Sequence, residues 1–136
     1  MGNLFLEVVT PEKVVVSQQV EIVVAPGSLG EFGVLPGHVP FLTGILPGEL
    51  RYTSDGKTQY LAVTTGFAEV SDNKVSILVD AAEKAQEIDV ERARRAMERA
   101  KERLSKDRGT PDIDFHRAEM ALKRAIARIR VAEKVM

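Results

Sequence analysis

The spacing of apolar residues changes near residue 80. Before that point apolar residues alternate with polar ones or form short blocks between turn residues, as in Leu4–Val9 and Lys74–Val79. Such alternation is typical of strands with one buried face. Asp55-Gly56 lies between two further blocks, at residues 50–53 and 58–63, and is typical of a tight hairpin turn. We therefore predict an antiparallel β-sandwich or flattened barrel over residues 1–84.

Beyond Asp80 the apolar residues recur with the period of a helix. One stripe comprises Ala93, Ala96, Met97, Ala100 and Leu104, and a second comprises Ala118, Ala121, Leu122, Ala125, Ile129 and Ala132. Helix-breaking residues at 108–111 separate the two stripes. We predict an antiparallel two-helix hairpin over residues 85–136 as a second domain. Its stripes are mostly alanine, which buries little area, so the hairpin should be weakly held.

Charge separates the two halves further. Residues 1–84 carry five Lys/Arg against ten Asp/Glu, whereas residues 85–136 carry fourteen against ten, and the whole chain has a formal charge of -1. The sequence contains no cysteine, which excludes disulfides, thiolate metal sites and a cysteine nucleophile. Its two histidines, His38 and His116, have no second nitrogen ligand nearby in the sequence. We expect no catalytic residues and no metal site.

Glycine and proline are concentrated between Gly27 and Phe41, a segment with four glycines, two prolines and His38. Glycine allows positive φ and close backbone approach, while proline fixes φ and removes a hydrogen-bond donor. The segment therefore cannot be a helix and should consist of turns that join short strands. It is either architectural or a surface that another molecule contacts.

The helical half repeats the pattern Ile-Asp-x-x-Arg-Ala, at Ile88–Ala93 and at Ile113–Ala118. The aspartate of each copy is a good N-cap, so the pattern indicates a helix start. Helical spacing aligns two basic stripes: Arg92, Arg99 and Arg103, then Arg117, Arg124 and Arg128. Arg124 and Arg128 have no acidic residue three or four positions away. This pair is either a clamp for polyphosphate or part of a solvated face.

Several segments together carry a family resemblance. They are GEFGVLPGHVP at 30–40, LTGILPGEL at 42–50, GFAEV at 66–70, the opening near residues 6–13 and the Ile-Asp-x-x-Arg-Ala pattern. Over its whole length the chain resembles the epsilon subunits of bacterial F-type ATP synthases. The resemblance implies a ten-stranded β-sandwich, followed by the helical hairpin, in a non-catalytic subunit. It further implies a peripheral position at the cytoplasmic face of the cell membrane.

The resemblance also implies partners and sites. The sandwich would contact the gamma subunit and the membrane rotor ring, with Glu31, Phe32 and His38 as the ring contacts. The tail resembles that of bacillus-like members, whose folded hairpin binds ATP as a regulatory ligand, with or without magnesium. There the extended hairpin reaches the catalytic head and inhibits ATP hydrolysis. By match of motif, the ATP-binding residues would be Glu83, Ile88, Asp89, Arg92 and Ala93 on the adenine and first-helix side, and Arg99, Arg124 and Arg128 at the phosphates.

Two other classes of function remain open. The basic stripes also suit a helical hairpin that binds nucleic acid or serves as a generic interaction module, although two tyrosines and no tryptophan leave few stacking platforms for bases. An enzyme is the third alternative, and the sequence shows no nucleophile–base pair to support it. We therefore expect a regulatory subunit with protein partners and no nucleic acid.

Overall fold

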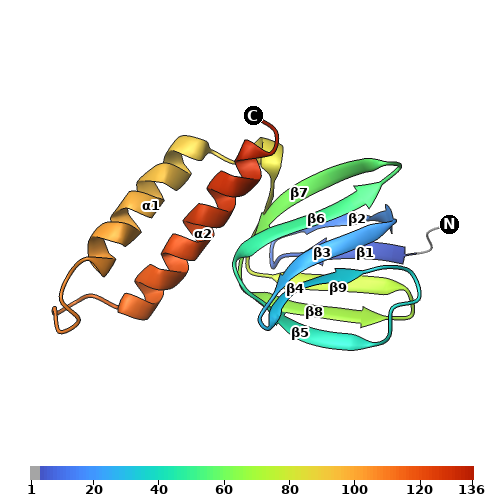
Figure 1. Cartoon of the computed structure of the whole chain (residues 1–136), viewed down its shortest axis with the longest axis horizontal. Coiled ribbons are helices and arrows are strands. Elements are labelled where there is room, and N and C mark those ends of the chain that lie inside the picture. Colours follow the sequence, from blue (N-terminus) through green and yellow to red (C-terminus); the bar gives the residue numbers. More distant parts are fainter. Residues whose placement is uncertain (1–3) are drawn as a thin grey trace.

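The computed structural model describes residues 4–136 and consists of a β-sandwich followed by two helices (Figure 1). The strands are β1 (Leu4–Val9), β2 (Val14–Val20), β3 (Ile22–Gly27), β4 (Gly30–Val34), β5 (Phe41–Ile45), β6 (Gly48–Ser54), β7 (Lys57–Val63), β8 (Gly66–Ser71), β9 (Lys74–Val79) and β10 (Ala82–Lys84). A single 3-10 turn, η1 (Ala85–Glu87), leads to α1 (Val90–Leu104) and α2 (Phe115–Glu133). The predicted sandwich and helical pair are confirmed.

The strands form one continuous ladder that folds into two layers. Its order is β10-β7-β6-β3-β5-β8-β9-β1-β2, and β4 pairs with β3 on the edge opposite β6. Only one residue pair, Gly27 with Ile45, joins β3 to β5, so the ladder can bend there. Alternate residues from both layers, including Leu6, Leu50 and Ile77, are buried in one apolar core.

One strand pair departs from the antiparallel pattern. β1 and β9 run parallel, with Phe5 opposite Lys74 and Val9 opposite Leu78, whereas the other pairs are antiparallel. Neighbouring strands joined by a short turn must be antiparallel. β1 and β9 lie far apart in the sequence, so no turn constrains their direction. The pairing joins the first strand of the sandwich to one of its last strands.

The segment rich in glycine and proline contains turns and two short strands, as predicted. β3 and β4 form a hairpin through Ser28 and Leu29, and the chain then turns through residues 35–40 into β5. Gly30 and Gly37 have φ of 122° and 84°, values that disfavour any side chain. The backbone N–H of Gly37 donates to Asn73 Oδ1 at 2.6 Å. This bond ties the turn to the β8–β9 hairpin.

Aspartate starts both helices. Asp89 accepts a hydrogen bond from the backbone N–H of Arg92 at 3.1 Å, and Asp114 accepts one from that of Arg117 at 3.0 Å. The predicted N-caps are therefore confirmed. Small buried residues, among them Ala100 and Ala125, allow the two helices to approach closely. Within residues 4–136 neither helix is long and apolar enough to cross a membrane.

α2 packs against β6 and β7 of the sandwich, and α1 lies on the side of α2 that faces away from the sandwich (Figure 1). Val131, which is fully buried, contacts a small apolar cluster of Ala62 and Ala85 with Tyr60 and Ile88 at its margin. Next to this cluster Lys134 lies 3.8 Å from a carboxylate oxygen of Glu49. Because the buried residues of this cluster are small, each adds little apolar area to the contact between the hairpin and the sandwich.

Candidate anion-binding site

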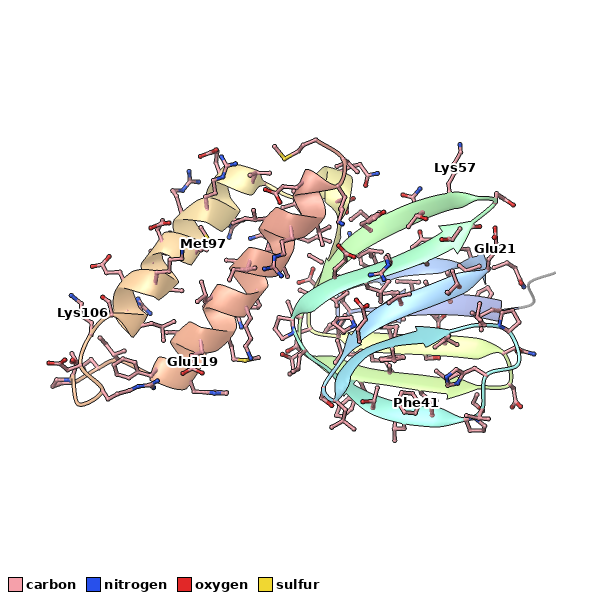
Figure 2. All side chains as sticks on the ribbon, in the orientation of Figure 1. Glu21, Phe41, Lys57, Met97, Lys106 and Glu119 are labelled. Carbon is pink, nitrogen blue, oxygen red and sulfur yellow. The ribbon has the colours of Figure 1, made fainter. Side chains whose placement is uncertain are left out.

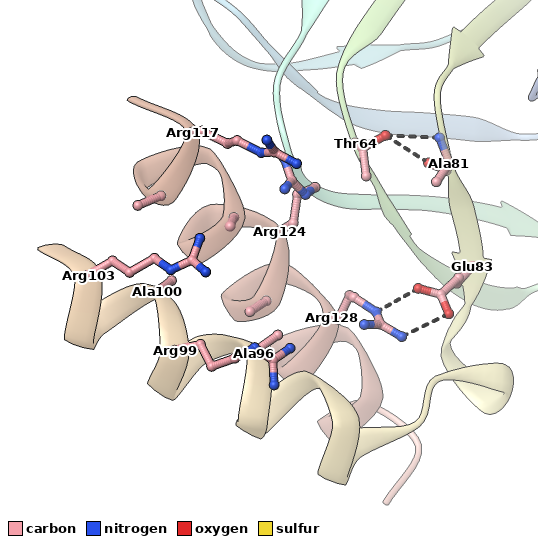
Figure 3. Close-up of a pocket in the computed structure, with 13 residues that line it drawn as sticks. Thr64, Ala81, Glu83, Ala96, Arg99, Ala100, Arg103, Arg117, Arg124 and Arg128 are labelled. Atoms are coloured by element: carbon pink, nitrogen blue, oxygen red, sulfur yellow. Dashed lines mark hydrogen bonds and ion pairs between the residues drawn. The ribbon is translucent and has the colours of Figure 1, made fainter. Parts of the chain in front are cut away.

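A pocket of about 440 Å³ opens where α1, α2 and the edge of the sandwich meet (Figure 3). The sandwich contributes Thr64 directly after β7, Ala81 directly before β10 and Glu83 within β10, and each helix contributes one face. The lining consists of Thr64, Ala81, Glu83, Ala96, Arg99, Ala100, Arg103, Arg117, Ala118, Ala121, Arg124, Ala125 and Arg128. The volume is within the range of small-molecule sites.

Five of the lining residues are arginines, and helical geometry explains their convergence. Arg99 and Arg103 are four residues apart on α1, so they project from the same face. On α2, steps of seven and eleven residues bring Arg124 and Arg128 close to the angle of Arg117. Alanines lie between them on both helices and occupy little space. The long basic side chains therefore surround the opening that the alanines leave.

Arg128 is the only pocket arginine that forms an ion pair within the described residues. Its Nε lies 2.6 Å from Glu83 Oε1, and its terminal nitrogen donates to Glu83 Oε2 at 3.2 Å (Figure 3). The Nε contact is close but is not aligned as a hydrogen bond, and this nitrogen is shielded from solvent. The pair connects β10 to α2 and so joins the sandwich to the hairpin.

The other four pocket arginines have no carboxylate partner among residues 4–136. Five guanidinium groups and one carboxylate give the lining a formal charge of +4. Guanidinium presents planar N–H donors that match the oxygens of phosphate and carboxylate. No group of three potential metal ligands of the His, Cys, Asp or Glu type occurs in the described part of the chain. The arrangement is suited to a polyanion.

The pocket unites half of the predicted ATP-binding residues. Glu83, Arg99, Arg124 and Arg128 line it. The other four lie outside the lining: Ile88 packs at the margin of the Val131 cluster, Asp89 caps α1, Arg92 is exposed and Ala93 is fully buried.

Two lining arginines, Arg103 and Arg117, were not among the predicted site residues. Both belong to the basic stripes that the sequence reveals, so the signal was present. Arg117 also occupies the arginine position of the second Ile-Asp-x-x-Arg-Ala copy. Arg92, the arginine of the first copy, does not line the pocket. Only the packing of the hairpin distinguishes the two copies.

The predicted ring-contact residues occupy two different surroundings. Phe32 and Phe41 meet edge to face with ring centroids 5.3 Å apart, and the His38 ring lies 6.0 Å from that of Phe41. Phe41 is the first residue of β5, on the sandwich (Figure 2). Glu31 instead accepts a hydrogen bond from Arg51 at 3.2 Å, which raises the pKa of Arg51. Glu31 also lines a groove that α2 borders.

Fold and pocket together define a two-domain chain, a β-sandwich with a helical hairpin docked on one edge and an arginine-lined pocket between them. Residues 3–85 match the family described as ATP synthase, Delta/Epsilon chain, beta-sandwich domain, and residues 86–133 match its long alpha-helix domain. The chain therefore belongs to the delta/epsilon chain family of ATP synthases, and it is a stalk component that is not itself catalytic.

Full-length relatives agree with this assignment. The ATP synthase epsilon chain of Nitratidesulfovibrio vulgaris is 53% identical over 129 residues, which cover 95% of both chains. That of Syntrophobacter fumaroxidans is 55% identical over 131 residues, again 95% of both chains. A chain in the Euglena gracilis mitochondrial ATP synthase, solved with OSCP, F1 and c-ring, superposes with a TM-score of 0.83 at 25% identity, covering 98% of this chain and 82% of that one. A Tetrahymena thermophila central stalk and c-ring structure shares the fold at a TM-score of 0.58 and 16% identity, covering 97% and 95%.

Proposed function

We propose that this chain is the epsilon subunit that connects the gamma subunit to the membrane rotor ring of a proton-translocating ATP synthase. Support comes from family membership over nearly the whole chain and from a structural relative solved together with F1 and a c-ring. The subunit would lie peripherally at the cytoplasmic face of the membrane. In this position it transmits rotation and takes no part in the chemical step.

The surface of the sandwich offers a separate contact for each partner. Leu42, Phe67 and Leu78, on the adjacent strands β5, β8 and β9, are 70%, 64% and 52% exposed. An exposed apolar face of this kind is typical of an interface, and we assign it to gamma. Glu31, Phe32 and His38 would contact the rotor ring, together with Phe41, whose ring lies beside those of Phe32 and His38.

We further propose that the hairpin is a regulatory element whose folded state binds ATP in the arginine pocket. The observation that carries this proposal is the convergence of five arginines and a single carboxylate where three elements meet. Both carboxylate oxygens of Glu83 face Arg128, so Glu83 would not connect the phosphates to the protein through a magnesium ion. The phosphates would therefore contact guanidinium groups directly, whether or not magnesium accompanies them. Because the lining comes from both helices and the sandwich, a bound ligand would bridge them.

A bound ligand would thereby oppose inhibition. Only a ligand with different affinities for two conformations changes their ratio. The pocket exists only while the hairpin is folded against the sandwich, so ATP would favour this state. Without ATP the weakly docked hairpin would extend along gamma toward the catalytic head and inhibit ATP hydrolysis. In this proposal the small docking area allows the change.

Calorimetric titration of Arg124→Ala and Arg128→Ala with ATP tests this function. Each change removes a charge-assisted phosphate contact of about 1.5 to 3 kcal/mol, so the affinity should fall on the order of tenfold to a hundredfold. Arg130→Ala is the matched control, because it removes the same charge from α2 at a residue outside the pocket. Unchanged affinity in both pocket variants would refute ATP binding at this site.

A further inference from the structure

We propose that the rotor ring contacts α2 as well as the sandwich, so that the docked hairpin forms one wall of the ring-contact surface. The inference rests on the proposed function, because it extends the ring contact assigned to Glu31 onto the hairpin. It assigns a partner to Lys123 and Arg130, which do not line the arginine pocket. It also couples ring binding to the position of the hairpin.

Glu31 lies in a groove between the sandwich and α2. The groove has a volume of about 480 Å³ and shares no lining residue with the arginine pocket. The sandwich supplies an acidic wall, with Glu31 of β4 and Glu49 of β6. α2 supplies a basic wall, with Lys123 and Arg130 on either side of Ile126 in the sequence. A ring segment that reaches Glu31 through this groove therefore lies against α2.

The sandwich side of the groove is rigid before any partner binds. Its lining includes two prolines, whose rings fix the backbone φ. A side chain at Gly48 would place its Cβ 2.7 Å from that of Pro26, so only glycine fits against this proline. Arg51 holds the carboxylates of Glu31 and Glu49 through contacts of 3.2 and 3.1 Å. A rigid groove loses little conformational entropy when a partner enters, which favours binding.

The basic wall has no ion-pair partner of its own. Lys123 and Arg130 are exposed, and neither forms an ion pair among residues 4–136. Their cationic groups are therefore available to another molecule. Since neither is paired with a carboxylate of the sandwich, their substitution should not release the hairpin.

A loop between two membrane-spanning helices has a charge pattern that fits the two walls. Such a loop joins the C-terminus of one helix, with unpaired carbonyl groups, to the N-terminus of the next, with unpaired N–H groups. The first end carries a partial negative charge and the second a partial positive charge. Lys123 and Arg130 would face the carbonyl end, and Glu31 would face the N–H end. We therefore place a loop of the ring in the groove.

Ring binding and hairpin docking then favour each other. The complete groove exists only while α2 is docked, so the docked chain binds the ring more tightly than the undocked chain. Linkage requires the ring to raise the ratio of docked to undocked hairpin by the same factor. An exposed ion pair or a contact with a helix end contributes up to about fivefold in affinity. With two such contacts on α2, the total factor should be about fivefold to twentyfold.

Binding of the full chain to the gamma subunit, alone and assembled with the rotor ring, tests the inference by biolayer interferometry. Lys123→Gln and Arg130→Gln should each weaken binding to the assembly by about twofold to fivefold and leave binding to gamma alone unchanged. Lys101→Gln is the control, because it removes an exposed charge from α1, outside the groove, and should change neither affinity. Glu31→Gln tests the ring contact of the sandwich and should also weaken binding to the assembly.

Energy transfer between a dye on the sandwich and one at the tip of the hairpin supplies a second measurement. Without a partner, the ratio of docked to undocked hairpin in Lys123→Gln and Arg130→Gln should equal that of the unsubstituted chain. The gamma–ring assembly should raise the ratio in the unsubstituted chain about fivefold to twentyfold above its value with gamma alone. A lower ratio in the two variants before any partner is added would mean that these residues hold the hairpin in place, and would overturn the inference.

The outcomes distinguish the inference from the function on which it rests. If Glu31→Gln weakens binding to the assembly but Lys123→Gln and Arg130→Gln do not, the ring contacts the sandwich only, so the inference is overturned while the function stands. Equal losses for gamma alone and for the assembly would mean that α2 contacts gamma, and this too would overturn the inference. If the unsubstituted chain binds gamma equally well with and without the ring, the ring contact of the proposed function is overturned together with the inference.

Discussion

Replacement of Glu83 by glutamine should release the hairpin from the sandwich without unfolding either domain. Glu83 belongs to β10 and contacts Arg128 of α2 through both carboxylate oxygens. Glutamine keeps the shape of the side chain but loses its charge and one acceptor. Arg128, whose Nε is shielded from solvent, would then lack a charged partner.

The size of the effect follows from the exposure of the pair. The two side chains are 21% and 35% exposed, so solvent screens their attraction in part. An exposed ion pair contributes up to about 1 kcal/mol, and a hydrogen bond to a charged group about 1.5 to 3 kcal/mol. For this half-buried pair we expect a loss of about 1 to 2 kcal/mol. At about 1.4 kcal/mol per factor of ten, the ratio of undocked to docked hairpin should rise about fivefold to thirtyfold.

Single-molecule energy transfer measures that ratio directly. The chain has no cysteine, so Lys57→Cys and Lys106→Cys introduce the only two labelling sites. Both are exposed, one on the sandwich and one at the tip of the hairpin (Figure 2). Glu119→Gln is the control, because it breaks the exposed ion pair with Arg108 away from the pocket and should leave the ratio unchanged.

Two results would refute this reasoning. An unchanged ratio in Glu83→Gln would mean that the ion pair does not hold the docked state. A loss of cooperative melting of the whole chain would mean that Glu83 supports the sandwich itself. The same sample also measures the effect of triphosphate, which should restore docking because its charge replaces that of the missing carboxylate.

Three further outcomes are expected. A fragment of residues 1–84 should melt cooperatively by circular dichroism, because the large apolar core lies within it; an unfolded fragment would contradict the two-domain interpretation. His38→Ala should weaken binding to the isolated rotor ring while changing stability by less than about 0.5 kcal/mol, and a large fall in melting temperature would instead make this residue structural. Ala93→Leu should overpack the fully buried surroundings of α1 at a cost of about 1 to 3 kcal/mol and increase the open population in the energy-transfer assay; an unchanged population would contradict the packing seen here.

Local sequence was sufficient to predict the elements and their ends. Alternation of apolar residues predicted the strands, and Asp55-Gly56 predicted the β6–β7 turn, where both residues have positive φ. Asp89 and Asp114 predicted the two helix starts, which the structure confirms. These features depend on backbone preferences within a few residues, so they can be read without knowledge of distant contacts.

Tertiary packing decided the composition of the pocket and the direction of the β1–β9 pair. Arg92 and Arg117 occupy equivalent positions in identical motifs, yet only Arg117 lines the pocket. Helical periodicity determines which residues share a face of one helix but not which part of that face meets the other helix or the sandwich. The bend between β3 and β5 and the docking of α2 set that alignment, and both arise from contacts between residues far apart in the chain.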